Sequence, residues 1–190
     1  MTSIVIKDLE ARAAAANGSI CVAYVYFRYS DASDLTIRGV LEILVKQIVE
    51  RHHDCELLAE QAYAPHLRER TQPTESELFE LLNRFTEGKA ITFYVLDALD
   101  EAPERLRLAL LKRLASMNVR LFITSRPLKD VEGRFPHACS FPISAQEGDL
   151  DLHINQEIAN SSVLEELLDE ADTSFKEEMI SLVKKNCGGM

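Results

Sequence analysis

The sequence predicts an α/β fold with a parallel sheet of about three to four strands, flanked by helices and followed by a helical C-terminal part. Short apolar runs at residues 20–27, 91–96 and 119–124 are separated by segments with apolar residues at helical spacing. The first two runs are nearly continuous in apolar residues, which is typical of strands covered on both faces. Strands that alternate with helices favour a parallel sheet.

The N-terminal segment reads as a helix over residues 2–16 that stops at Asn17-Gly18, because glycine adopts the left-handed conformation at little cost. After the strand at 20–27, Asp34 is expected to cap the next helix. One face of that helix carries apolar residues at 3.6-residue spacing. They are Ile37, Val40, Leu41, Leu44, Val45 and Ile48.

Two adjacent histidines, His52 and His53, follow this helix. Neighbouring residues point in different directions on a helix, so the pair is expected at the surface and not as a metal site. Residues 55–72 predict less regular structure, with a short helix before Pro65.

A capping box at Thr74 and Glu77 predicts the start of a helix that ends at Gly88. Pro103 is expected as the first residue of a further helix that runs to about Met117. Across the sheet, the strand that begins at Ile20 is expected beside the one that begins at Ile91, and the strand that begins at Val119 on the other side of the latter. The weak strand pattern at residues 139–143 is expected to be displaced or poorly paired.

The chain is expected to divide into a core over residues 1–145 and an acidic helical segment of the same module over residues 146–190. The net charge of −10 is concentrated in that second segment, which argues against a nucleic-acid partner. No apolar run is long enough for a membrane span. The cysteines Cys21, Cys55, Cys139 and Cys187 are far apart, which favours reduced thiols in a cytoplasmic protein.

Three carboxylates follow the second strand directly, at Asp97, Asp100 and Glu101. Ligands of open α/β sheets lie beyond the carboxyl ends of the strands. Asp97 would orient a magnesium ion, and Asp100 or Glu101 would polarise an attacking water. A solvated acidic turn, in which Asp97 or Asp100 caps the next helix, is an equally good interpretation.

An arginine follows the third strand in Ser125-Arg126-Pro127. Pro127 favours an extended conformation for Arg126 at the carboxyl edge of the sheet. Its planar fork of donors would suit a γ-phosphate. The alternative is a salt bridge to Asp97 or Asp100.

A phosphate loop of the form GxxxxGK[ST] is absent from the sequence. The only Gly-Lys pair, Gly88-Lys89, is followed by Ala90, and Asn83 stands five residues before Gly88. No GxGxxG occurs either.

Two segments together resemble known motifs. Residues 93–101 are similar to the Walker B motif, and residues 121–127 to the sensor 1 motif, of NACHT-type STAND P-loop NTPases. The likeness is closest to the nephrocystin 3-like N-terminal domains that are abundant in fungi. It implies an ATP- or GTP-dependent signalling or assembly switch with magnesium. By position, Asp97 would be the magnesium-side acid, Asp100 and Glu101 the hydrolytic acids, and Arg126 the sensor.

In that family the first strand and the phosphate loop precede the helix that begins this sequence, and further regions follow. The resemblance therefore implies a domain shortened at both ends, which would not turn over nucleotide detectably. Protein partners or self-assembly are expected. The alternative is a non-enzymatic interaction module with a vestigial site. A metal-dependent phosphoesterase that uses Asp97, Asp100 and Glu101 directly ranks last.

Overall fold

The computed structural model describes residues 2–31, 35–143, 147–169 and 173–186. Asp34 and residues 144–146 and 187–190, on which some sequence predictions fall, lie outside the described residues. The chain forms two compact units, Met1–Ala138 and Cys139–Met190, which are considered separately below. No helix among the described residues combines the length and the apolar character that crossing a membrane requires.

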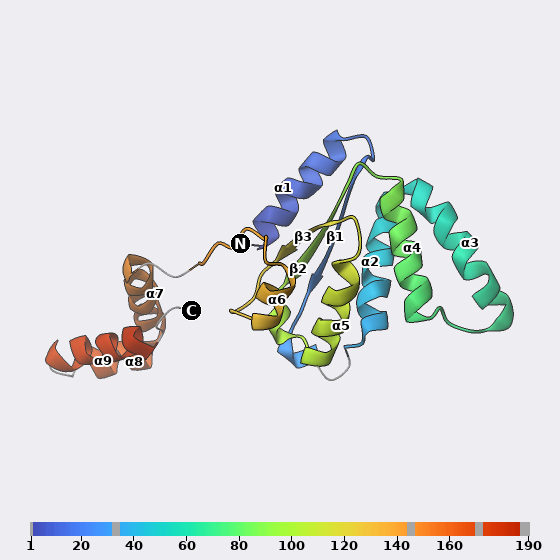
Figure 1. Cartoon of the computed structure of the whole chain (residues 1–190). Coiled ribbons are helices and arrows are strands. Elements are labelled where there is room, and N and C mark those ends of the chain that lie inside the picture. The colour runs from blue at the N-terminus through green and yellow to red at the C-terminus, as the bar shows by residue number, and fades with distance from the viewer. Residues whose placement is uncertain (1, 32–34, 144–146, 170–172, 187–190) are drawn as a thin grey trace. The chain divides into compact units, whose positions relative to one another are not determined.

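The first unit is built on a three-stranded parallel sheet (Figure 1). Strands β1 (Ile20–Tyr26), β2 (Ile91–Asp97) and β3 (Arg120–Ile123) lie in the order β1-β2-β3, with β2 in the middle. The predicted fold class and strand order are confirmed. Residues 139–143 form no strand, in line with the expectation that this segment would not pair normally.

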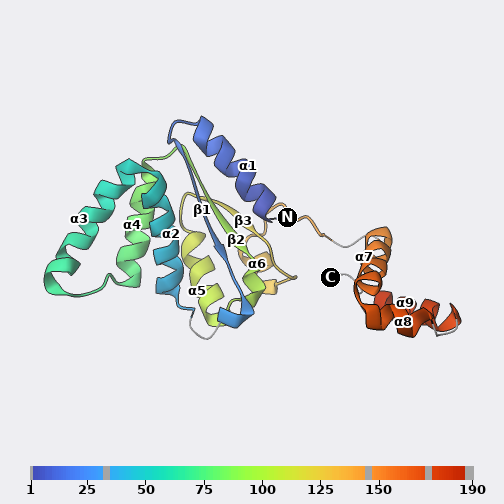
Figure 2. The ribbon, with the colours of Figure 1, turned by 180° about the vertical axis from the view of Figure 1, so that it is seen from behind.

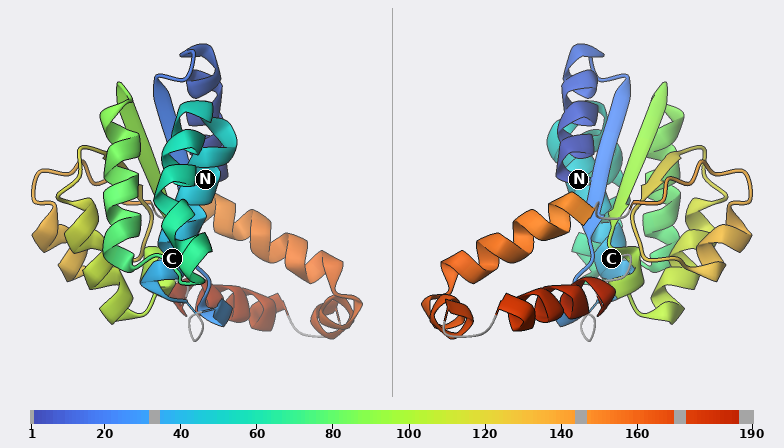
Figure 3. Two further views of the ribbon diagram at one scale, coloured as in Figure 1. Left: turned by 90° about the vertical axis from the view of Figure 1, so that its right-hand side faces the viewer. Right: turned by 90° about the vertical axis from the view of Figure 1, so that its left-hand side faces the viewer.

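Helices cover both faces of the sheet, as Figures 2 and 3 show from other sides. On one face α1 (Thr2–Ala15) buries Ile6 and Leu9 against Val22 and Val95. The other face carries the main core, which is formed with α2 (Ile37–Arg51), α4 (Glu75–Glu87) and α5 (Glu104–Leu114). Alternate residues of β1 enter the two clusters, as the two-residue period of a strand requires.

Several shorter elements complete the chain. The first unit also contains α3 (His53–Glu69), α6 (Lys129–Arg134) and the 3₁₀ turns η1 (Tyr29–Asp31) and η2 (Leu99–Glu101). The second unit contains α7 (Glu147–Asn160), α8 (Ser162–Asp169) and α9 (Thr173–Asn186). Within that unit, the Lys184 ammonium forms an ion pair with the Asp151 carboxylate.

Of the predicted caps of α2 and α4, the second is confirmed and the first is not. The capping box of α4 is confirmed, because the Thr74 amide donates to Glu77 Oε2 at 2.7 Å and the Glu77 amide donates to Thr74 Oγ1 at 3.3 Å. The expected cap of α2 at Asp34 is wrong. Thr36 caps that helix, with its hydroxyl oxygen accepting from the Gly39 amide at 3.1 Å.

Two predictions about the α2–α3 region are wrong for long-range reasons. α3 runs for 17 residues and contains Pro65 in its interior, because it packs against α2 and α4. His52 is buried, with 8% of its surface exposed, since the chain turns there between the two helices. Burial lowers the pKa of His52.

The α5 helix begins at Glu104, with Pro103 one position before it.

A buried hydroxyl in β2 gives a first testable expectation. Tyr94 is fully buried, and its hydroxyl has no hydrogen-bond partner among the described residues. An unsatisfied buried polar group destabilises a fold, so Tyr94→Phe should raise the free energy of unfolding by about 1 kcal/mol. Urea titration of the two proteins measures this difference. A clearly less stable variant would show that the hydroxyl makes a favourable interaction.

Candidate functional site

Asp97 is the last residue of β2, and its carboxylate lies where three elements converge. Its Oδ1 atom accepts hydrogen bonds from the hydroxyl of Thr2, at the start of α1, and from the hydroxyl of Thr124, just after β3, at 2.6 Å for the latter. Thr2 is only 6% exposed. The N-terminus of α1 and the ends of β2 and β3 are thus joined through one carboxylate.

The backbone turns sharply after Asp97. Ala98 adopts the left-handed conformation with φ 53°, which costs a non-glycine residue about 1–2 kcal/mol. Its amide donates to the Thr124 hydroxyl oxygen at 3.0 Å, and the Leu99 amide donates to the Thr124 carbonyl at 2.9 Å. These bonds fix the turn that directs Asp100 and Glu101 along the carboxyl edge. Backbone strain of this kind is concentrated at functional sites.

Arg126 and Asp100 lie together on this edge. The Arg126 amide donates to Asp100 Oδ1 at 3.2 Å, and its Nε atom lies 3.5 Å from Asp100 Oδ2. The Asp100 side chain is 19% exposed, whereas that of Arg126 is 80% exposed. The salt bridge proposed from the sequence as an alternative is therefore present, and it leaves most of the guanidinium in solvent.

Glu101 contacts a different part of the edge. Its Oε2 atom accepts a hydrogen bond from the Tyr29 amide at 2.8 Å, which ties the loop after β1 to the turn after β2. The three predicted acids thus share one edge but have separate partners. Across the described ranges, no group of three or more His, Cys, Asp or Glu side chains is placed to hold a metal.

Thr2 and Thr124 were not identified from the sequence. Thr124 ends an apolar run immediately before the Ser125-Arg126-Pro127 segment, so its position next to the site offered a usable signal. Thr2 is 95 residues away from Asp97 in sequence, and no local pattern marks it. Only the packing of α1 across β1 and β2 brings its hydroxyl to the carboxylate.

The oxygen atoms of Asp97 and Thr2 suit a magnesium ion. Mg²⁺ prefers oxygen ligands, and proteins commonly hold it through one or two carboxylates while water and phosphate oxygens complete the octahedron. A single carboxylate with an adjacent hydroxyl fits this pattern. The two residues would hold the metal, and a bound nucleotide would supply further oxygen ligands.

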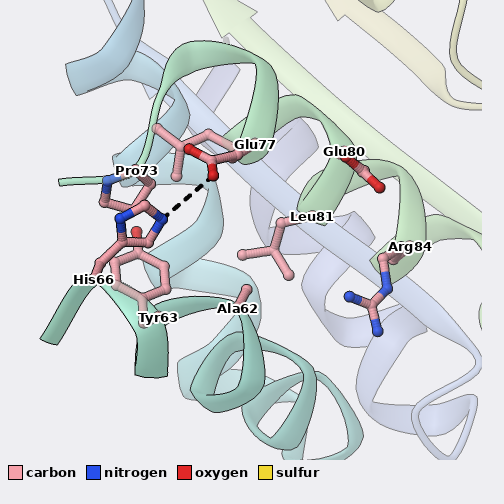
Figure 4. A pocket seen from close by; sticks show the side chains of 9 residues that line it. Ala62, Tyr63, His66, Pro73, Glu77, Glu80, Leu81 and Arg84 are labelled. Carbon is pink, nitrogen blue, oxygen red and sulfur yellow. Dashed lines mark ion pairs between the residues drawn. The ribbon is translucent and has the colours of Figure 1, made fainter. Parts of the chain in front are cut away.

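A separate pocket lies between α3 and α4 and has a volume of about 180 Å³ (Figure 4). Its wall includes His66 and Glu77, whose Nε2 and Oε1 atoms are 3.5 Å apart. None of the residues on the acidic edge lines it. Ligand pockets usually measure about 300–1,000 Å³, so this one is too small for a nucleotide.

The fold and the edge define an α/β protein whose candidate site lies at the carboxyl ends of parallel strands, where such folds bind their ligands. The sequence profile of the nephrocystin 3 N-terminal domain matches residues 1–126, and the chain belongs to this NACHT-associated family. The match runs from α1 to Arg126 and includes every candidate site residue. No curated protein and no solved structure matches the chain.

Proposed function

We propose that this chain is a nucleotide-responsive switch domain of the NACHT, STAND NTPase type that binds ATP or GTP with magnesium at the carboxyl edge of its sheet. The observation that carries the proposal is the bonding of Asp97 to the hydroxyls of Thr2 and Thr124. That arrangement places an oriented carboxylate and a metal-compatible hydroxyl next to the first turn of a helix. Helix N-termini favour anions such as phosphate.

Each edge residue has a role in this proposal. Asp97 and Thr2 would hold the metal, which would supply positive charge to neutralise the phosphates. Glu101 and Asp100 are the acids that would orient and polarise a water molecule beside a γ-phosphate in a domain that hydrolyses nucleotide. Arg126 would contact a γ-phosphate in place of Asp100, because 80% of its side chain is exposed and its contact with Asp100 leaves other donors free. Asp100 would then lose its contact with Arg126. The conformation of the carboxyl edge would therefore depend on whether a γ-phosphate is bound.

The 190-residue sequence lacks the GxxxxGK[ST] loop that would cradle the phosphates. We therefore expect this polypeptide by itself to bind nucleotide with a dissociation constant of about 1 mM or weaker, corresponding to about −4 kcal/mol. Turnover should be undetectable, and the chain is not proposed to be an enzyme on its own. The role of the domain would be the family's assembly or signalling switch. Cys21 and Cys55, which are buried and unpaired, support a cytoplasmic location.

Asp97→Asn tests the metal-binding part of the proposal. The amide keeps the size of the side chain but removes the negative charge that a magnesium ion requires. The thermal midpoint of the unmodified chain should rise when millimolar Mg²⁺ and ATP or GTP are added together, and this rise should be lost in the variant. An equal rise in both proteins would contradict the proposed site. Hydrolysis above the rate of the variant would contradict the expected inactivity.

A non-enzymatic interaction module is the second candidate function. It is favoured by apolar side chains that are exposed on the helices of the second unit. They include Leu152, Val163, Leu167, Phe175 and Leu182. Light scattering and pulldown without nucleotide separate the two functions, because only the switch requires that association change when nucleotide is added.

A further inference from the structure

The pocket between α3 and α4 is separate from the carboxyl edge of the sheet. Its walls come from these two helices and the segment that joins them, and none of the described residues that line it belongs to α1 or to a strand. Helix α3 lies on the outside of the first unit, with α2 and α4 between it and the sheet (Figures 1 and 2). The pocket is therefore built independently of the candidate nucleotide site.

The floor of the pocket is apolar and well packed. Leu78 is fully buried, Leu81 is 3% exposed and Pro73 is buried. Figure 4 shows the Leu81 side chain directed into the pocket from α4, with Ala62 on the α3 side. The volume of about 180 Å³ compares with about 150 Å³ for an apolar cavity that holds one benzene ring. The pocket thus accommodates one side chain of the size of leucine, methionine or phenylalanine.

The polar wall of the pocket is held in place by contacts outside it. His66 Nδ1 lies 2.8 Å from Thr71 Oγ1. Glu77 Oε2 accepts a hydrogen bond from the Thr74 amide at 2.7 Å, and the bonds from Thr74 lower the pKa of Glu77, so its carboxylate is ionised at neutral pH. The atoms that face each other, His66 Nε2 and Glu77 Oε1, are 3.5 Å apart, which exceeds the about 2.7–3.2 Å of an ordinary hydrogen bond. Glu77 Oε1 can therefore accept a hydrogen bond from a cation at the rim.

Charge around the pocket is divided along α4. Glu77, Glu80 and Arg84 are spaced three and four residues apart, so they lie along one face of the helix. Neither Glu80 nor Arg84 forms a hydrogen bond or ion pair with another residue in the described part of the chain. Arg84 stands at the end of the pocket opposite His66 (Figure 4), and the two helices together carry eight acids and two arginines. The surface is therefore complementary to a cation beside the two glutamates, an apolar group in the pocket and an acid beside the arginine.

We propose that the α3–α4 pocket is a docking site for a helical segment of a partner protein that carries Lys or Arg, one large apolar residue and Asp or Glu at successive turns of one face. Amphipathic helices bind hydrophobic grooves through anchors at positions i, i+3 or i+4 and i+7. Helix α4 presents the matching series Glu77, Leu81 and Arg84 at this spacing. The apolar anchor fills the pocket, and the two charges fix the register of the bound helix. A small metabolite fits less well, because pockets for such ligands usually measure about 300–1,000 Å³. The docking does not depend on the proposed nucleotide function.

Synthetic helical peptides test the occupant. An alanine-rich peptide with lysine, leucine and glutamate at positions i, i+4 and i+7 should bind the full chain at millimolar concentration or below and shift amide signals of α3 and α4. Replacing its leucine by alanine should weaken binding about tenfold or more, and replacing its lysine by glutamate about two- to fivefold. Absence of binding, or equal binding of the three peptides, would overturn the proposal. The small amine 2-phenylethylammonium carries a ring and a cation without a helix. If it bound as tightly as the first peptide, the pocket would be a small-molecule site and the proposed occupant would be wrong.

Variants of the chain locate the binding. Ala62→Leu fills the pocket and should weaken binding of the first peptide about tenfold, whereas Gln61→Leu adds the same side chain at an exposed position of α3 outside the pocket and should leave binding unchanged. Glu80→Lys should invert the charge preference, so that the peptide with glutamate in place of lysine binds more tightly. The matched Glu87→Lys, at an exposed position of α4 that does not line the pocket, should keep the original preference. Equal effects of the two leucine variants, or an unchanged preference in Glu80→Lys, would contradict docking at this site.

Discussion

Leu82→Ala is expected to lower the free energy of unfolding by about 2–5 kcal/mol, a large part of the roughly 5–15 kcal/mol that stabilises a typical domain. Leu82 is fully buried in α4 and belongs to the main core, on the helix that packs against α2 and α3. Truncation removes buried apolar surface and leaves a cavity that the surrounding helices cannot fill completely. Urea titration followed by circular dichroism measures the loss.

Leu67→Ala provides the matched control, because the same chemical change is made at a position on α3 that is 79% exposed. Its effect should stay within about 0.5 kcal/mol. Equal losses in the two variants would contradict the assignment of Leu82 to the main core.

Asp54→Ala is expected to destabilise the chain by about 2–3 kcal/mol. The Lys89 ammonium is almost completely buried, with 3% of its side chain exposed, and Asp54 is its carboxylate partner at 2.7 and 2.9 Å. Removing one member of a buried pair leaves an uncompensated charge, which costs about 3–5 kcal/mol when both members are buried. The Asp54 side chain is 62% exposed, so water reduces this cost. Denaturant titration gives the difference.

Two comparisons isolate the buried charge. Lys89→Met removes the ammonium while keeping most of the buried stem, so its cost should be smaller than that of Asp54→Ala. Asp8→Ala breaks an exposed ion pair with Arg12 and should change stability by less than about 0.5 kcal/mol. A larger loss for Lys89→Met than for Asp54→Ala would show that packing of the lysine stem, and not the burial of its charge, dominates.

The same region predicts a loss of stability in acid. The hydrogen bond from Lys89 lowers the pKa of Asp54 below its ordinary value of 3.8, and burial lowers that of His52 below 6.5. Both groups bind protons more readily in the unfolded chain, so stability rises with pH through these ranges. Proton uptake by His52 in the unfolded chain should lower the free energy of unfolding as the pH falls below about 6.5. Proton uptake by Asp54 should lower it further below about pH 4. His52→Gln should flatten the first part of a stability profile measured from pH 7 to pH 5. An unchanged profile in that variant would contradict a buried, neutral His52.

The sheet could be predicted because its strands carry their signals locally. The runs that begin at Ile20 and Ile91 are nearly continuous in apolar residues, and the Thr74–Glu77 capping box is complete within four positions. Features that depend on packing were missed. Pro65 was expected to limit a helix, but contacts with α2 and α4 stabilise α3 across it. The burial of His52 likewise follows from the turn between two packed helices.

The acids and the arginine of the candidate site could also be predicted from local signals, whereas a residue that packing brings there could not. Asp97, Asp100 and Glu101 follow a strand directly, and Arg126 follows its neighbour, so parallel pairing alone brings them to one edge. Thr2 was missed, since its contact with Asp97 arises only after α1 has packed across the sheet. The side-chain hydrogen bonds to Asp97 therefore come from Thr2, which no motif marks, and from Thr124, which lies in the segment similar to sensor 1 but was not singled out.

We propose that the edge formed by Asp97, Thr2 and Thr124 is the metal-side half of a nucleotide site. Paramagnetic broadening of amide signals by Mn²⁺ with ATP or GTP tests it most directly, because this method detects millimolar binding. The amides of Leu99, Glu101 and Thr124 should broaden first, those of Ser19 and Ala90 at the opposite edge should stay sharp, and Asp97→Asn should abolish the effect. Broadening that is equal at both edges, or unchanged in Asp97→Asn, would contradict the account.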